Sequence, residues 1–316
     1  MSIVTLLKNE EFPELKYYIK SNVPRKSAFV SNKLHKPFSK TEIRVKYGDI
    51  EPYQARRIGN ISDYMFCLVL AKTVKSNKRE IYESLNWRAM ELFCGCIKSE
   101  DKKYYMQEVV FEKALKKTEE FINGMNVSIK EVIQAAYTIY KMEDYLHYIS
   151  YYSKEQFLSN FLEPCENDVV EQVVHMIRIF EEQFIESGLV CEDSVVISHP
   201  WFDPWSSKCG GGVADVYIDG FIYDFKSTKE IGYHWDEVGQ VYAYYLLNCL
   251  CKKDYEHEKE LYINAPLADK DVIGIGLYFS RYGIIEKCSL AESGVLVSAE
   301  DVCYLEDMIN KYVNKK

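Results

Sequence analysis

Two aspartates and a lysine in the second half of the chain have the spacing of a hydrolytic metal site. Asp219-Gly220 stands between two apolar runs, and this dipeptide favours a two-residue β-hairpin because both residues tolerate positive φ. That turn fixes the register, so Asp215 lies opposite Asp224 and points to the same face. Lys226 shares this face because side chains alternate along a strand. The hairpin therefore predicts two carboxylates and an ammonium group on one surface.

Two facing carboxylates repel each other, and one tends to keep its proton unless a cation lies between them. A hard divalent cation held by carboxylate oxygens lowers the pKa of a bound water and neutralises charge that develops on a phosphate. Lys226 could orient that water or stabilise the transition state as a point charge. The alternative is a hairpin with a solvated charged face. The hairpin alone leaves both interpretations open.

Two pairs of polar residues at helical spacing extend this candidate site. Gln240 and Tyr244 lie four residues apart on the helix expected after the hairpin, so both side chains share one face and could touch a phosphate or a sugar. Glu171 and His175 have the same spacing on an earlier helix, away from its apolar stripe. Either could supply another metal ligand, although an exposed Glu–His pair is also common on helices.

The elements that carry these residues are predicted from apolar periodicity. In the first half, helix-length periodicity covers residues 56–74, 82–96, 108–123 and 128–150. In the second half, the order is helix 168–187, strands 194–199, 212–218 and 221–227, helix 235–251, strands 272–279 and 284–290, and helix 298–313. This order predicts an α/β fold with one mixed central sheet flanked by helices. We place a mainly helical domain at 1–160 and the sheet domain at 161–316.

Three motifs in this order resemble those of the PD-(D/E)xK nuclease superfamily, in the branch of RecB-like, CRISPR-associated and phage-exonuclease-like domains. The matching segments are Gly211-Gly212-Val213-Ala214-Asp215, Asp224-Phe225-Lys226 and Gln240-Val241-Tyr242-Ala243-Tyr244. Gly212 departs from the family pattern, which prefers an apolar residue there. The resemblance implies an αβββαβ restriction-endonuclease-like core and a DNA-cleaving phosphodiesterase that depends on Mg²⁺ or Mn²⁺.

The resemblance also implies a role for each residue. Asp215 and Asp224 would bind the metal with the Phe225 carbonyl as a third ligand, and Lys226 would act on the nucleophilic water. Gln240 and Tyr244 would lie beside the substrate strand. The first motif is open: the RecB-like branch favours His175 as a further ligand, and the exonuclease branch favours Glu171. A module of the same fold that binds nucleic acid without cutting it is the alternative function.

Composition limits the other possibilities. The chain has 316 residues, of which 47% are hydrophobic and 28% charged, as in globular proteins. No signal peptide and no run of ~20 apolar residues is present, so we expect a cytoplasmic protein without a membrane partner. None of the ten cysteines forms a Cys-x-x-Cys pair, which argues against the common zinc and iron–sulfur frameworks.

The charge is unevenly distributed. A net charge of −9 is not typical of nucleic-acid-binding proteins, yet residues 20–46 hold eight basic residues against the single acid Glu42. This stretch is either a solvated basic face or a strip that contacts phosphates. The helical first half is a candidate surface for a protein partner. The pathway stays open among DNA repair, recombination, mobile elements and antiviral defence.

Overall fold

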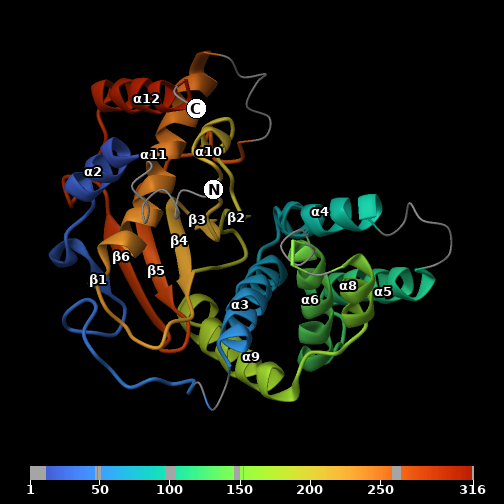
Figure 1. Cartoon of the computed structure of the whole chain (residues 1–316). Coiled ribbons are helices and arrows are strands. Elements are labelled where there is room, and N and C mark those ends of the chain that lie inside the picture. The colour runs from blue at the N-terminus through green and yellow to red at the C-terminus, as the bar shows by residue number, and fades with distance from the viewer. Residues whose placement is uncertain are drawn as a thin grey trace. The chain divides into compact units, whose positions relative to one another are not determined.

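The computed structural model describes residues 12–46, 48, 51–96, 104–145, 150–151, 153–257 and 265–314. It divides into two compact units (Figure 1). One comprises Met1–Glu42 and Ile197–Lys316 and contains the sheet, and the other comprises Ile43–Val196 and is helical. We call them the sheet unit and the helical unit. Their limits differ from the division at residue 160 expected from the sequence.

Within the described residues, six strands form one mixed sheet in the order β1-β6-β5-β4-β3-β2. Strand β4 pairs in parallel with β5, whereas β3/β4, β5/β6 and β1/β6 are antiparallel. The α/β class and the mixed sheet flanked by helices are thereby confirmed. The strands are β1 (Val30–Ser31), β2 (Val196–Ser198), β3 (Val216–Ile218), β4 (Phe221–Lys226), β5 (Gly274–Phe279) and β6 (Ile284–Ser289).

The predicted hairpin register is also confirmed. Val216 pairs with Tyr223 and Ile218 with Phe221 across the turn. Asp219 has φ of 45° and Gly220 of 95°, the positive values that the two-residue turn requires. On the face that carries the charged residues, Asp224 is 3% exposed and the side chain of Lys226 is 15% exposed. The hairpin therefore does not present a solvated charged face, and that alternative is wrong.

Helix α11 (Trp235–His257) connects the parallel strands β4 and β5 and contacts both of them. It lies alongside the sheet with α2 and α12 beside it (Figure 1). Gly239 lets α2 approach closely, since a Cβ there would be 3.3 Å from Ile19 Cγ2. The other helices of this unit are α2 (Pro13–Asn22), η1 (Lys26–Ala28), α10 (Trp205–Lys208) and α12 (Ala299–Val313).

The helical unit contains the helices predicted in the first half of the chain, together with α9. The helix expected at 128–150 ends at Glu143, and residues 146–149 of that range lie outside the described residues. Helix α9 packs against α3 and α6, and the Phe180 ring stacks on Phe66 at 4.4 Å between centroids. The helix predicted at 168–187 thus packs with the helical unit, and the last part of it, Glu181–Ile185, is a π-helix. The helices are α3 (Pro52–Thr73), α4 (Lys78–Cys96), α5 (Tyr105–Ile122), α6 (Ile129–Glu143), α8 (Lys154–Phe161) and α9 (Asn167–Phe180).

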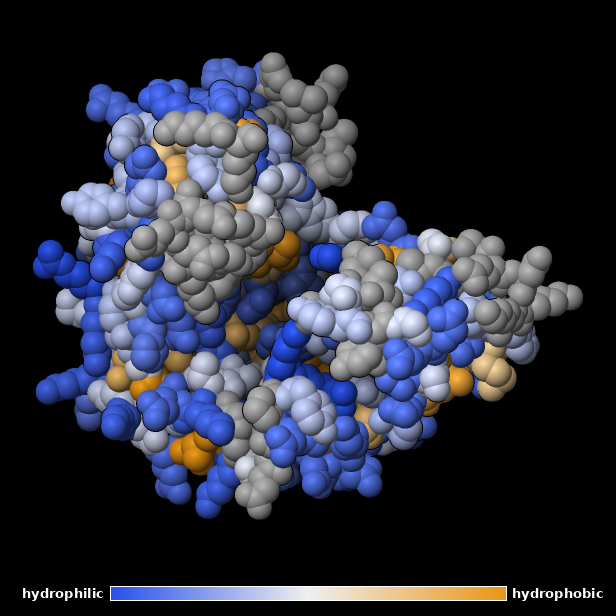
Figure 2. Space-filling model, in the orientation of Figure 1, coloured by the Kyte–Doolittle hydropathy of each residue, from blue (hydrophilic) through white to orange (hydrophobic). Residues whose placement is uncertain are grey.

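In the part of the chain that the structure describes, no helix has the length and apolar character needed to cross a bilayer. On the face drawn in Figure 2, hydrophilic residues predominate and the hydrophobic ones form small separate patches.

Candidate active site

The two aspartates of the hairpin lie together near the C-terminal end of β4. Asp224 is 3% exposed. The backbone N–H of Phe225 donates a hydrogen bond to Asp215 Oδ2, which holds the Asp215 carboxyl against the strand that carries Asp224. The hairpin backbone therefore holds the Asp215 carboxyl in place.

This arrangement changes the acidity of Asp215. Burial and the neighbouring Asp224 carboxylate raise the pKa of Asp215 from its ordinary value of 3.8 to about 8, and the Phe225 N–H and Lys226 only partly oppose them. The metal-free pair consequently retains a proton at neutral pH. A divalent cation that replaced this proton would relieve the repulsion between the two carboxylates.

Lys226 forms an ion pair with Asp224, and its side chain is 15% exposed. Burial lowers the pKa of Lys226, but the Asp224 and Asp215 carboxylates outweigh burial and raise it above its ordinary value. The ammonium group is therefore charged throughout the physiological pH range. It can donate hydrogen bonds and stabilise negative charge, and it is not a general base.

The Gln240 amide connects three of the predicted residues. Its Nε2 donates to Asp224 Oδ1 and to the Tyr244 hydroxyl, both at 2.9 Å, and its Oε1 accepts from Lys226 Nζ at 3.2 Å. One side chain of α11 thus fixes the orientation of a carboxylate and an ammonium group on β4. Gln240 positions Asp224 and Lys226, a role that the sequence did not indicate.

Tyr244 accepts a hydrogen bond from Gln240 through its hydroxyl and is only 3% exposed. Its ring stacks on Phe202 with 5.8 Å between centroids. Gly212 packs closely beside it, because a Cβ at this position would lie 3.1 Å from Leu247 Cδ1, which would have to move by a few tenths of an ångström. The departure of Gly212 from the family pattern therefore has a packing reason.

The backbone of Phe225 adds a carbonyl oxygen on the side of β4 that faces Asp215. The N–H and the C=O of a strand residue point to the same neighbouring strand. Since the Phe225 N–H reaches Asp215, its carbonyl lies on the Asp215 side of β4. Carboxylate and carbonyl oxygens are the ligands that Mg²⁺ and Mn²⁺ prefer.

Glu237 was missed by the sequence analysis. It lies one helical turn before Gln240 on α11, its Oε2 is buried without a hydrogen-bond partner, and Lys226 and Asp224 both act on its ionisation. Burial raises the pKa of Glu237, and Lys226 opposes this. The three-residue spacing to Gln240 could have drawn attention to it.

The two candidates for the first motif lie on α9. Glu171 is exposed and forms an ion pair with Lys130 of α6, and His175 is also exposed. Among the described residues, no group of three His, Cys, Asp or Glu side chains could hold a metal ion. The donors present in the sheet unit, two carboxylates and a carbonyl, still fit Mg²⁺, which keeps several waters in most protein sites. The choice between His175 and Glu171 stays a prediction.

No protein-family model, curated protein or solved structure matches this chain. The geometry of the site therefore carries the functional argument.

Proposed function

We propose that this protein is a nuclease that hydrolyses the phosphodiester bonds of DNA with Mg²⁺ or Mn²⁺. The observation that carries the proposal is the group formed by the buried Asp224 with the half-buried Asp215, Lys226 and Gln240, in which the raised pKa of Asp215 leaves it protonated beside a charged lysine. The order of a hairpin, a helix and a parallel strand around this group agrees with the αβββαβ core of the PD-(D/E)xK superfamily.

Each residue has a role that follows from its surroundings. Asp215, Asp224 and the Phe225 carbonyl would hold the cation, which when bound supplies positive charge to the phosphate and lowers the pKa of water. Lys226, held by Gln240, would donate to the attacking water or to a phosphate oxygen. Tyr244 supports Gln240 from the interior, so its predicted contact with the substrate would have to pass through Gln240.

The burial of the site argues against a module that only binds nucleic acid. Placing the Asp215 carboxyl beside the buried Asp224 costs stability, since burial and the neighbouring carboxylate disfavour the charged form of Asp215. A surface that merely held DNA would gain nothing from this pair. A metal-dependent hydrolase would need this pair, because a bound cation relieves the repulsion between the two carboxylates.

The proposal is tested by incubating the purified protein with linear duplex, circular duplex and single-stranded DNA and with RNA. Each substrate is combined with Mg²⁺, Mn²⁺ or EDTA. We expect cleavage of DNA that requires the metal and stops with EDTA. Binding of DNA without cleavage under every condition would favour the non-cleaving module instead.

The same assay addresses the first motif. If His175 binds metal, His175→Ala loses activity and the parent's activity falls as the pH drops through the titration of the imidazole, because only the neutral ring binds metal. If Glu171 is the ligand, Glu171→Ala loses activity and that pH dependence is absent. Activity equal to that of the parent in both variants would assign metal binding to the hairpin alone.

A further inference from the structure

A cavity lies within the helical unit, formed by α3, α6 and α8. Its volume is about 480 Å³, inside the range of small-molecule sites. Its walls combine aromatic rings with cationic side chains, chiefly Tyr53, Arg56 and Arg57 of α3, Tyr137 and Lys141 of α6, and Phe161 of α8. None of these residues takes part in the candidate active site.

The aromatic and cationic side chains alternate in one continuous ladder. The Arg57 guanidinium lies 5.5 Å from the Tyr53 ring centroid and 5.0 Å from that of Tyr137. Lys141 Nζ lies 4.4 Å from the Tyr137 centroid and 5.3 Å from that of Phe161. Such contacts are favourable within about 6 Å. The ladder holds two cations at fixed positions in the cavity wall.

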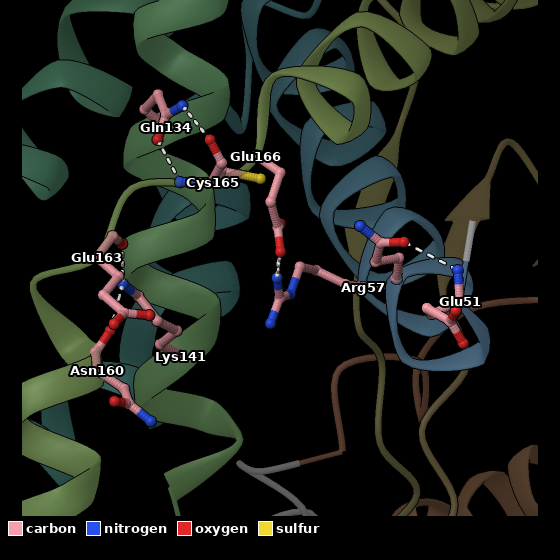
Figure 3. Close-up of polar contacts among 9 residues, drawn as sticks. Glu51, Arg57, Gln134, Lys141, Asn160, Glu163, Cys165 and Glu166 are labelled. Atoms are coloured by element: carbon pink, nitrogen blue, oxygen red, sulfur yellow. Dashed lines mark hydrogen bonds and ion pairs between the residues drawn. The ribbon is translucent and has the colours of Figure 1, made fainter. Parts of the chain in front are cut away.

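Part of the hydrogen-bonding capacity of Arg57 is left for a ligand. Its two hydrogen bonds to the Glu166 carboxylate, at 2.7 and 2.6 Å, both start from Nη1 (Figure 3). A guanidinium has five N–H donors, so this carboxylate does not engage Nε or Nη2. Arg56 adds a further cation, paired with Asp144 at 3.1 Å but 57% exposed, and such exposed pairs rearrange at little cost.

Lys141 contributes charge at the cavity wall. Its Nζ donates to the backbone carbonyls of Asn160 and Glu163 (Figure 3) and to that of Phe161, at the end of α8. Burial and the nearby Arg57 lower the pKa of Lys141 to about 8, against the opposing effects of Cys165 and Glu163. Two like charges thus share the Tyr137 ring, and an anion in the cavity would be attracted to both.

The surrounding backbone is fixed in place. Gln134 of α6 exchanges two hydrogen bonds with the backbone of Cys165, at 3.0 and 2.8 Å, and so anchors the loop that carries Glu166 (Figure 3). At the start of α3, the Glu51 N–H donates to the Gln54 side chain at 2.9 Å, in a capping box that begins the helix just before Tyr53. The cavity is consequently preformed, which reduces the entropic cost of binding.

We infer that this cavity binds a mononucleotide, with the base against the exposed Tyr53 ring and the phosphate at Arg56 and Arg57. Every nucleobase has a π-face that stacks on aromatic side chains. Arginine recognises phosphate through paired, charge-assisted hydrogen bonds.

The test is calorimetric titration of the full-length protein, in EDTA, with each of the four ribonucleoside 5′-monophosphates. Adenosine and inorganic phosphate serve as partial ligands. Arg57→Gln removes the principal phosphate donor, and Arg56→Gln is a second variant at an exposed position. Arg79→Gln is the matched control, because Arg79 pairs with Glu83 on α4 and lies outside the cavity lining. Asp224→Asn tests whether binding is independent of the candidate active site.

We expect saturable binding of at least one mononucleotide to a single site, weaker binding of adenosine and of phosphate, and equal affinity in Asp224→Asn and Arg79→Gln. Arg57→Gln should weaken the affinity about tenfold or more, since it removes a charge-assisted contact. If Arg57→Gln does not fold, as judged by circular dichroism, the comparison is made with Arg56→Gln. Absence of saturable mononucleotide binding, or affinity unchanged in the folded arginine variant, would overturn the inference.

Discussion

At the scale of single residues, the proton that Asp215 retains beside Asp224 is the feature that most distinguishes this site from an ordinary surface hairpin. Burial and the Asp224 carboxylate hold the pKa of Asp215 at about 8, against 3.8 for an ordinary aspartate. Between these two values the folded, metal-free protein keeps a proton that the unfolded chain releases. The free energy of unfolding therefore falls as the pH rises through this window.

The first prediction concerns this pH dependence. For metal-free protein, we expect the Asp215 site to lower the free energy of unfolding by on the order of 1.4 kcal/mol per pH unit as the pH rises from about 5 to about 7. Asp215→Asn should lack this contribution because its amide does not titrate. Urea unfolding in EDTA at several pH values measures both proteins. Parallel curves for the parent and the variant would show that Asp215 titrates normally.

The second prediction separates Lys226 from Gln240. Lys226→Ala removes a donor that acts on the reacting groups, so cleavage should slow by roughly 10²–10³-fold. Gln240→Ala removes a positioning contact to Asp224 and Lys226, which should cost about 10–100-fold. In both variants Mn²⁺ affinity should change much less than in Asp224→Asn, as measured by calorimetry. An equal loss of Mn²⁺ binding in Lys226→Ala would give the lysine a role in holding the carboxylates.

The residues of this site differed in how far the sequence could predict them. Asp215, Asp224 and Lys226 follow from the local turn at Asp219-Gly220, because period-2 geometry places side chains without reference to the rest of the fold. The bonding of Gln240 depends on how α11 crosses the sheet, which is a long-range property. The position of the buried Glu237 carboxyl near Lys226 and Asp224 likewise depends on how α11 packs against the sheet.

At the scale of elements, the hairpin turn determines where the two aspartates meet. Gly220 has φ of 95°, and a Cβ at this position would lie 2.7 Å from Ile273 Cγ1 at the approach to β5. Gly294, also at positive φ, has no atom within 4 Å of its ideal Cβ. Substitutions at Gly294 and Gly220 therefore distinguish backbone strain alone from backbone strain with steric overlap.

The third prediction uses this pair. Gly294→Ala should lower the free energy of unfolding by roughly 1–2 kcal/mol, the cost of a left-handed conformation for an L-residue. Gly220→Ala should cost more, because the same strain is joined by overlap with Ile273. Urea unfolding of both variants measures the difference. A smaller loss in Gly220→Ala than in Gly294→Ala would mean that the turn relaxes without affecting β5.

Elements defined by local signals were easier to predict than those defined by distant partners. The Asp219-Gly220 hairpin and the long amphipathic helices were found from spacing alone. Strand β1 was missed because it has only two residues, Val30 and Ser31, whose pairing with Lys287 and Glu286 lies far along the sequence. Helix α8 was missed as well, since eight residues give little periodicity to recognise.

At the scale of the whole molecule, the packing divides the chain differently from its sequence pattern. Helix α9 joins the helical unit through α3 and α6, whereas the segment before residue 43 joins the sheet unit through β1 and α2. An apolar stripe shows that a helix is covered but does not identify its partner. For this reason the sequence predicted α9 correctly as a helix and grouped it with the sheet.

The fourth prediction follows from this division. A fragment of residues 43–196 contains α9 and should unfold cooperatively with strong helical circular dichroism. A fragment of residues 43–160 lacks α9 and exposes the apolar surfaces of α3 and α6 that this helix covers, including Phe66. It should be aggregated or only partly folded. Equal cooperativity in both fragments would restore the boundary near residue 160.

The most direct test of the proposed nuclease site is metal-dependent DNA cleavage by the parent protein and by Asp224→Asn. Asp219→Asn is the matched control, because it makes the same chemical change in the same hairpin at a turn position where asparagine tolerates positive φ. We predict that the parent and Asp219→Asn cleave DNA with Mg²⁺ or Mn²⁺, while Asp224→Asn keeps its circular dichroism spectrum and loses cleavage and Mn²⁺ binding. Full cleavage by folded Asp224→Asn would contradict the assignment of the active site.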